Sequence, residues 1–174
     1  MKRRALIALG SNIDPERNLP AAAARLAAHP DVEVLAASGV YESPPLGHPG
    51  DPCFHNAALA VVTSLGPVPL RGELRRLEAE LGRVRSEDRY APRPIDLDLV
   101  AYEGFAGLVG GGRIPDPEIE RRAFLALPLA EISPEWTEPE LGRSLEEIAA
   151  SFDAGRERVR RLPGPGLGLP RPSR

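Results

Sequence analysis

The chain has 174 residues, the length of one ordinary domain, and can bury about 70% of the surface that its unfolded form exposes. Its 22 basic and 25 acidic side chains leave a formal charge of −3, which excludes the global basic field typical of nucleic-acid-binding proteins. A hydrophobic content of 42% excludes wholesale disorder, and the single cysteine, Cys53, excludes an intramolecular disulfide and a cysteine-based zinc cage. The first apolar run stops at Gly10, too soon for a signal peptide, and no stretch has the ~18 apolar residues of a membrane span, so we expect a cytoplasmic protein.

The beginning of the chain predicts a strand followed by a helix. Arg4–Leu9 is a short apolar run, as expected of a buried strand. Asp14-Pro15-Glu16 has the N-cap residue, the proline and the acidic side chain that begin a helix. Pro20 conflicts with that start because it would lie beyond the free first turn, so we expect the alanine-rich helix to begin near Asn18 and end at Ala28.

Two strands separated by a stiff loop come next. Val32–Glu42 contains β-branched residues with rough alternation, and Phe54–Ser64 is strongly apolar, so we expect a strand at each. Between them, residues 43–52 include four prolines and two glycines. That composition forbids a regular element and predicts a loop.

The middle of the chain predicts a helix and a further strand. Pro67–Gly82 carries leucines at spacings of four, three and four residues, which form one apolar stripe, and it ends at a glycine. Residues 83–94 are polar and aperiodic, whereas Ile95–Tyr102 alternates as a strand does. Farther on, Ser144–Phe152 reads as a short amphipathic helix that begins with the Ser-x-x-Glu pattern of a capping box.

This order of strand, helix, strand, strand, helix, strand is the split βαβ pattern of an α+β domain. We therefore expect a ferredoxin-like βαββαβ core, with an antiparallel sheet and with the helices packed on one face. Residues 163–174 contain four prolines and three glycines and are not expected to form regular structure. The six arginines and one glutamate of residues 156–174 give a net charge of +5, which is compatible with a solvated tail or with docking on an acidic neighbour.

The sharpest local feature is Asp96-Leu97-Asp98 in the last predicted strand. Alternation places both carboxylates on one face, about 6.7 Å apart along the strand, while Ile95, Leu97 and Leu99 face a core on the other side. Two carboxylates on an otherwise apolar strand repel each other and are costly to bury unpaired. Arginines or metal ions must neutralise them, and hard oxygen ligands without histidine or cysteine favour Mg²⁺.

Four arginines precede this strand within eleven residues, at positions 83, 85, 89 and 93. A helix C-terminus, where cations are favoured, explains at most Arg83 and Arg85, and it does not explain the other two. Planar cationic donors beside a carboxylate pair are what a polyphosphate requires, because Mg²⁺ bridges phosphate oxygens and arginines stabilise the transferring charge. No P-loop sequence is present.

A second constellation combines the proline-rich loop with the strand that follows it. The stiff loop Ser43-Pro44-Pro45-Leu46 can present backbone groups to a ligand. Phe54 and Asn56 share one face of their strand, and an aromatic ring beside an amide suits a flat heterocycle by stacking and paired hydrogen bonds. Core packing of Phe54 and a strand-end role for Asn56 remain the alternative interpretation.

Five motifs occur in order along the chain. They are Ala8-Leu9-Gly10-Ser11-Asn12, Tyr41-Glu42-Ser43-Pro44-Pro45-Leu46-Gly47, Phe54-His55-Asn56-Ala57-Ala58, Gly82-Arg83-Val84-Arg85, and the most specific, Arg89-Tyr90-Ala91-Pro92-Arg93-Pro94-Ile95-Asp96-Leu97-Asp98-Leu99. Together they resemble the family of 6-hydroxymethyl-7,8-dihydropterin pyrophosphokinases of folate biosynthesis, from about Ala5 to Pro134. Several motifs at compatible spacings make coincidence a poor explanation.

The resemblance implies a ferredoxin-like enzyme that transfers a diphosphoryl group from ATP to the pterin's hydroxymethyl oxygen and releases AMP. Residues 1–162 would be the single catalytic domain and residues 163–174 a basic extension. Two Mg²⁺ ions would be held by Asp96 and Asp98, and the transferring phosphates would be contacted by Arg83 and Arg93. The pterin pocket would be lined by Gly10, Ser43, Pro44, Pro45, Leu46, Phe54, Asn56 and Phe124. The ATP site would be formed by Glu78, Arg85, Arg89, Tyr90, Leu99, Arg113 and Arg122.

Two positions depart from the family pattern. Asp116 follows Ile114-Pro115 where relatives usually carry histidine, so an anion replaces a potential donor to ATP phosphates. Tyr90 stands where tryptophan is common, and the arginine-rich extension has no counterpart that we can match. The expected partners are ATP and the dihydropterin, without nucleic acid or membrane, and we expect a monomer or a weak dimer.

Two other classes remain possible from the residues. An RNA-binding module on the same fold needs exposed aromatic side chains and a basic face, whereas Ile95–Tyr102 offers two acids. A different two-metal enzyme, such as a nucleotidyl transferase or a nuclease, could use Asp96 and Asp98. The products distinguish these possibilities.

Overall fold

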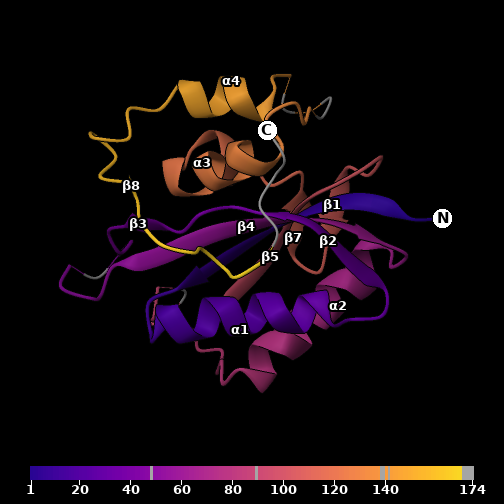
Figure 1. The fold of residues 1–174 in the computed structure, drawn as a ribbon, viewed down its shortest axis with the longest axis horizontal. Coiled ribbons are helices and arrows are strands. Elements are labelled where there is room, and N and C mark those ends of the chain that lie inside the picture. Colours follow the sequence, from indigo (N-terminus) through magenta and orange to yellow (C-terminus); the bar gives the residue numbers. More distant parts are fainter. Residues whose placement is uncertain (48, 89, 138–139, 141, 170–174) are drawn as a thin grey trace.

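In the computed structural model, the expected strands pair into one six-stranded antiparallel sheet (Figure 1). The structure describes residues 1–47, 49–88, 90–137, 140 and 142–169. The strand order is β5 (Asp96–Tyr102), β1 (Arg3–Ser11) and β4 (Phe54–Thr63), after which β2 (Val32–Ala37) and β3 (Tyr41–Ser43) both pair with β4. This is the order of a βαββαβ unit, and the ferredoxin-like fold is confirmed. The sixth strand, β8 (Arg160–Arg161), comes from the chain end and pairs with β3.

The edge strand expected at Val32–Glu42 is divided into β2 and β3 by residues 38–40. The backbone N–H of Ser38 donates to the Ala58 carbonyl at 3.0 Å, and the Ser38 hydroxyl accepts from the Ala58 N–H at 2.8 Å. A side chain therefore replaces a backbone partner at this point, and the register between β2 and β4 shifts just before it. The break is local, since both halves pair with the same strand.

Helix α1 (Pro15–Ala27) begins three residues earlier than expected, so the start near Asn18 is wrong. Pro15 occupies the first turn, where its missing N–H costs nothing, and the Asp14 carbonyl accepts from the Asn18 N–H at 2.9 Å. Pro20 lies inside the helix and removes one hydrogen bond. Four apolar side chains of α1 are buried against the sheet, and this packing outweighs the lost bond.

Helices cover both faces of the sheet (Figure 1). The two helices of the βαββαβ unit, α1 and α2 (Pro67–Glu80), lie on one face, as expected. The other face is covered by α3 (Ala123–Ile132) and α4 (Leu145–Ala150), which the βαββαβ pattern alone did not predict. The capping box at the start of α4 is present, with the Ser144 hydroxyl accepting from the Glu147 N–H at 3.2 Å.

Smaller elements complete the layers. A hairpin of β6 (Gly107–Val109) and β7 (Gly112–Ile114) lies beside α2, and a 3₁₀ turn, η1 (Pro117–Glu120), precedes α3. None of the described helices combines the length and the apolar character needed to cross a membrane.

The chain end is docked on the sheet as far as residue 169 and is not a free tail, although most of its side chains are exposed. Strand β8 (Arg160–Arg161) pairs with β3 and extends the sheet by one strand. The following residues pass to the α1 side of the sheet (Figure 1), where Leu167 is 3% exposed within the core. Residues 163–169 form no helix or strand, as expected, and residues 170–174 of the predicted extension lie outside the described part.

Candidate functional site

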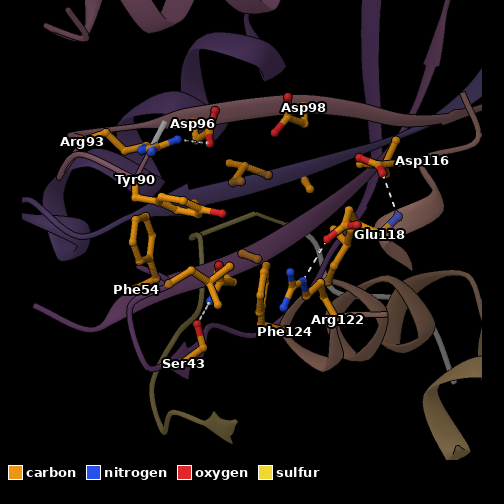
Figure 2. Close-up of a pocket in the computed structure, with 18 of the residues that line it drawn as sticks. Ser43, Phe54, Tyr90, Arg93, Asp96, Asp98, Asp116, Glu118, Arg122 and Phe124 are labelled. Atoms are coloured by element: carbon orange, nitrogen blue, oxygen red, sulfur yellow. Dashed lines mark hydrogen bonds and ion pairs between the residues drawn. The ribbon is translucent and has the colours of Figure 1, made fainter. Parts of the chain in front are cut away.

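A cavity of about 300 Å³ opens on the α3 side of the sheet, between the strands, the start of α3 and the two long loops (Figure 2). Its lining residues are Ala8, Leu9, Gly10, Ser43, Pro44, Leu46, Phe54, Asn56, Ala57, Tyr90, Arg93, Asp96, Asp98, Val100, Asp116, Glu118, Arg122, Phe124 and Leu125. A cavity of this size suits a small organic ligand.

The floor of the cavity is a set of strand positions that share one face. Asp96 pairs with Gly10 across β5 and β1, and Gly10 pairs with Asn56 across β1 and β4. Side chains in such a row point to the same face of the sheet. Asp98, two residues after Asp96 on β5, and Phe54, two residues before Asn56 on β4, point to that face as well. Gly10 leaves the middle of the row without a side chain, so a flat ligand can lie on the strand there.

One end of the cavity is built for a flat polar ring. Asn56 Nδ2 donates to Ser43 Oγ at 2.9 Å and to the Tyr41 carbonyl at 3.3 Å, which fixes the orientation of the amide. Figure 2 shows the rings of Phe54, from β4, and Phe124, from α3, standing on either side of this end. Two facing aromatic rings and an oriented amide can stack on a heterocycle and hydrogen-bond to its edge.

The other end holds a carboxylate that is paired with two arginines. The Arg83 guanidinium donates to Asp96 Oδ1, and Arg93 Nη1 donates to Asp96 Oδ2 at 3.0 Å. Burial alone would raise the pKa of Asp96, but the two guanidinium groups lower it below its ordinary value. Asp96 is therefore ionised at neutral pH.

Asp98 lies in the opposite electrostatic situation. Burial, with the negative charges of Asp96, Glu78 and Asp116, raises the pKa of Asp98 to about 7, and Arg71 opposes the shift only in part. Figure 2 shows Asp98 and Asp116 facing the same part of the cavity. This part of the site carries more negative charge than the surrounding cations balance, so it favours a bound cation.

A buried glutamate supports the carboxylate-and-arginine end from behind. Glu78, which is 1% exposed, accepts from the Leu97 N–H at 2.7 Å, from Arg83 at 2.6 Å and from Arg85 at 2.6 Å. Because Leu97 lies on the edge strand β5, Glu78 ties α2 to the strand that carries Asp96 and Asp98. Burial raises the pKa of Glu78, and the Leu97 N–H and Arg83 act against that shift.

The geometry agrees with a comparison against known protein families. Residues 6–134 match the family model described as 7,8-dihydro-6-hydroxymethylpterin-pyrophosphokinase, HPPK. The chain belongs to the HPPK family. Among relatives, the 2-amino-4-hydroxy-6-hydroxymethyldihydropteridine pyrophosphokinase of Methylorubrum extorquens is 42% identical over 160 residues, covering 90% of this chain and 98% of that protein. The protein of the same name from Bacillus subtilis is 37% identical over 161 residues, covering 92% of this chain and 90% of that protein.

Solved structures support the HPPK fold. The crystal structure of Plasmodium falciparum HPPK-DHPS wild type with pteroate matches with a TM-score of 0.74 at 12% identity. The match covers 92% of this chain but 46% of that one, so the chain spans about half of the larger protein. At this identity the likeness concerns the fold.

Most of the residues expected from the HPPK resemblance meet in the cavity. Those that line it are Gly10, Ser43, Pro44, Leu46, Phe54, Asn56, Tyr90, Arg93, Asp96, Asp98, Arg122 and Phe124. Three further residues, Glu78, Arg83 and Arg85, form the ion-pair network behind Asp96.

The remaining expected residues of the HPPK site lie apart or outside the description. Leu99 is buried in the core on the opposite face of the sheet, and Arg113 is exposed and pairs with Glu140 at 2.8 Å. Pro45 is absent from the lining, although its two neighbours in the loop, Pro44 and Leu46, both line the cavity. Arg89 lies outside the described residues.

Several lining residues were not expected from the HPPK resemblance. Ala8 and Val100 lie two residues from Gly10 and Asp98, so strand alternation was a sufficient signal for both. Glu118 comes from the irregular turn η1 and accepts from Arg122 Nε at 2.8 Å. The position of Glu118 depends on how that turn packs over the sheet, and no local sequence pattern predicts it.

The two long loops of the HPPK site touch each other. Gly47 has a φ of +99°, and a Cβ placed on it would lie 2.7 Å from Tyr90 Cγ. The aromatic ring therefore lies directly against the backbone of the proline-rich loop, where only glycine fits without displacement. Tyr90 connects the loop that follows α2 with the loop that follows β3.

Proposed function

We propose that this member of the HPPK family is an ATP- and Mg²⁺-dependent enzyme of folate biosynthesis. It transfers a diphosphoryl group from ATP to 6-hydroxymethyl-7,8-dihydropterin and yields AMP and the pterin diphosphate. The observation that supports this best is the division of one cavity into a ring-binding end and a carboxylate-and-guanidinium end. Those two ends match the two chemically different parts of the reaction.

The dihydropterin would bind at the ring-binding end. Its flat bicycle would stack between Phe54 and Phe124 above Gly10, and the oriented amide of Asn56 would pair with polar atoms on its edge. Ser43, Pro44, Pro45 and Leu46 would close the pocket from the proline-rich loop. This placement directs the hydroxymethyl group towards the Asp96 side of the floor.

The triphosphate and two Mg²⁺ ions would bind at the other end. Asp96 and Asp98 are hard oxygen ligands, and the raised pKa of Asp98 marks an unbalanced negative charge that a cation relieves. In the described part of the chain, no cluster of three or more His, Cys, Asp or Glu side chains could hold a metal ion. The phosphate oxygens of ATP and water would therefore complete each coordination shell, and the bound ions would neutralise charge on the phosphates.

The transfer itself requires positioning and charge stabilisation. The hydroxymethyl oxygen would form a bond to the β-phosphorus of ATP and lose its proton to solvent, while the bond from that phosphorus to the α–β bridging oxygen breaks and AMP leaves with that oxygen. Arg83 and Arg93 lie beside Asp96, at the side of the cavity where the transferring phosphates would bind. Their planar donors can stabilise the charge that develops on the transferred group.

The nucleotide would extend from the carboxylate end between the loop after α2 and the start of α3. Arg122 and Tyr90 line the cavity, and Glu78 and Arg85 lie next to it. For Leu99, Arg113 and Arg89 the assignment rests on the motif match alone. Closure of the two loops over ATP would exclude water and limit wasteful hydrolysis.

We also assign the catalytic role to one domain, residues 1–162, with residues 163–174 as a basic extension. The expected working form is a cytoplasmic monomer or weak dimer that needs no nucleic-acid partner.

Chromatography of a mixture of protein, ATP, Mg²⁺ and 6-hydroxymethyl-7,8-dihydropterin tests the proposal. We expect AMP to appear in step with consumption of the pterin. Formation of ADP, release of pyrophosphate or cleavage of a nucleic-acid strand would contradict the diphosphoryl transfer.

The variant Asp98→Ala tests the metal assignment in the same assay. Its turnover should fall below detection while its circular dichroism spectrum stays unchanged, because the variant lacks one of the two carboxylates. Turnover at the level of the unchanged protein would overturn the role of Asp98.

A further inference from the structure

One row of paired residues crosses the sheet from the carboxylate end of the cavity to the docked chain end. Asp96 pairs with Gly10, Gly10 with Asn56, Asn56 with Tyr41, and Tyr41 with Arg161. Residues that face each other across strands point to the same side of the sheet. Arg161 therefore shares the α3 side with the floor of the cavity, although it lies outside residues 6–134, which match the family model.

On that side Arg161 forms an ion pair with Glu131 of α3. Its Nη2 and Nε donate to Glu131 Oε1 and Oε2 at 2.8 and 3.2 Å, the two-point geometry that favours arginine. The same carboxylate accepts from the Tyr41 hydroxyl at 2.7 Å and from the Gly39 N–H at 3.1 Å. Glu131 therefore joins three segments, namely α3, the β2–β3 edge and β8.

Glu131 lies on the same helix as Phe124, the aromatic side chain on the α3 side of the cavity. Phe124 and Glu131 are seven residues apart on α3, which places them on one helix face about 10 Å apart along the axis. The Asn56 end of the cavity floor is held by β3, where Ser43 lies two residues after Tyr41 and accepts from the Asn56 amide. The position of α3 against β3 thus sets where the Phe124 ring stands relative to the Asn56 amide on the floor.

The glycine at position 39 leaves room for this contact. A Cβ on Gly39 would lie 2.6 Å from Arg161 Cζ, so the guanidinium group rests on bare backbone. The segment is anchored after Arg161, by the Leu162 N–H donating to the Val40 carbonyl at 2.8 Å and, farther along, by buried Leu167. Arg161 is thus held in place by its own strand and not only by the ion pair.

We propose that Arg161 is a positioning residue for the pterin slot: by holding Glu131 of α3 against β3, it fixes the distance between Phe124 and the Ser43–Asn56 pair on the cavity floor. This role rests on the proposed function for the identity of the ligand. It acts through α3 and β3 on the ring-binding end, whereas Asp96, Asp98 and the arginines that pair with Asp96 belong to β5 and the loop before it. Loss of Arg161 should weaken pterin binding and spare ATP binding.

The experiment compares the Michaelis constants for the two substrates in Arg161→Ala, each at saturating concentration of the other. We expect the KM for the dihydropterin to rise about tenfold and the KM for ATP to stay within twofold. Arg161→Lys keeps the charge but not the two-point contact, and it should recover part of the loss. If Arg161→Ala does not fold, the lysine variant carries the test by the same ratio of Michaelis constants.

Arg160→Ala is the matched control. Arg160 is the neighbouring arginine of β8, points to the other side of the sheet and pairs with Glu42 at 2.8 Å. Its removal takes away the same charge and an ion pair of the same length, yet both Michaelis constants should stay within twofold. The proposal is overturned if Arg161→Ala behaves like this control, or if it raises both Michaelis constants together with a fall in melting temperature.

Direct binding separates this inference from the proposed function. If the unchanged protein forms no AMP, the proposed function fails, and titration of the fluorescent dihydropterin in the presence of Mg²⁺ and a non-hydrolysable ATP analogue still tests Arg161. Weaker binding to Arg161→Ala than to Arg160→Ala supports the positioning role. Equal binding to the two variants, or no binding to the unchanged protein, overturns it.

Discussion

The carboxylate of Asp98 lies among other negative charges, and burial together with these charges raises its pKa from 3.8 to about 7. A raised pKa means that the folded protein holds this proton more tightly than the unfolded chain. The contribution of Asp98 to stability is therefore present in full below about pH 4 and is lost as the pH rises through 7. At pH 8 the ionised side chain opposes folding unless a cation is bound.

The variant Asp98→Asn tests this opposition of function and stability. At pH 8 in EDTA, its free energy of unfolding should exceed that of the unchanged protein by about 1–3 kcal/mol, while its turnover falls about a thousandfold or more. Urea denaturation and the AMP assay measure the two quantities. Addition of Mg²⁺ and ATP should raise the melting temperature of the unchanged protein more than that of the variant. A less stable variant in EDTA would contradict the charge argument.

Glu131 differs from Asp98 because its partners are hydrogen-bond donors. Partial burial alone would raise the pKa of Glu131, but the Arg161 and Tyr41 side chains and the Gly39 N–H lower it below its ordinary value of 4.5. A lowered pKa gives stability that is present above the unfolded value and is lost as the pH falls through the folded value.

Glu131→Gln should reveal that dependence. At pH 7 the variant should lose about 1–2 kcal/mol of unfolding free energy, because a charged acceptor for three donors becomes neutral. As the pH falls below 4.5 the difference from the unchanged protein should shrink, since Glu131 itself becomes protonated. Urea denaturation across this range measures the difference, and a gap that widens towards low pH would disprove the assignment.

At the scale of elements, the two long loops depend on each other through Gly47 and Tyr90. Gly47 and Gly50 both have positive φ, +99° and +104°, in the same loop. A Cβ on Gly47 would meet the Tyr90 ring at 2.7 Å, whereas a Cβ on Gly50 would meet nothing within 4 Å. An alanine at either position introduces backbone strain, but only an alanine at Gly47 also disturbs the contact between the two loops.

Gly47→Ala should separate the two loops, with Gly50→Ala as its control. Both variants should lose about 1–2 kcal/mol of unfolding free energy, because alanine is strained at positive φ. The displaced Tyr90 in Gly47→Ala should also admit water, so the ratio of ATP hydrolysis to pterin transfer should rise several-fold. Chromatography with and without the pterin measures that ratio. An equal ratio in the two variants would show that the contact does not control access.

At the scale of the whole molecule, the end of the described chain joins the two layers. After α4 on one face, β8 extends the edge of the sheet, and Leu167 then enters the core on the α1 side (Figure 1). The layers on both faces are thus tied by one continuous segment. Unfolding of either layer should therefore release the other.

Leu167→Ala tests this connection. It should lower the free energy of unfolding by about 2–4 kcal/mol, the usual effect of truncating a buried leucine, while the unfolding curves from fluorescence and circular dichroism stay superimposed. Leu108→Ala is the control, because Leu108 is 76% exposed and its truncation should change stability by less than about 0.5 kcal/mol. Effects of equal size would show that the chain end does not support the core.

Local chemistry in the sequence determined much of the fold and the character of the site. Apolar runs and alternation predicted the strands, the leucine stripe predicted α2, and Ser144 with Glu147 predicted the start of α4. Alternation also placed Asp96 with Asp98, and Phe54 with Asn56, on shared faces, and the ordered motifs pointed to the HPPK family. These features depend on residues a few positions apart, for which backbone geometry sets the relation.

The tertiary structure alone decided the arrangements that join distant segments. Glu78 reaches the Leu97 N–H across α2 and β5, Phe124 closes the cavity because α3 covers the second face, and Arg161 meets Glu131 and Tyr41 from three separate parts of the chain. Even the start of α1 depends on packing, because burial of its apolar face outweighs the local cost of Pro20. Such contacts follow from which faces the packed layers bury together, and no short stretch of sequence carries that information.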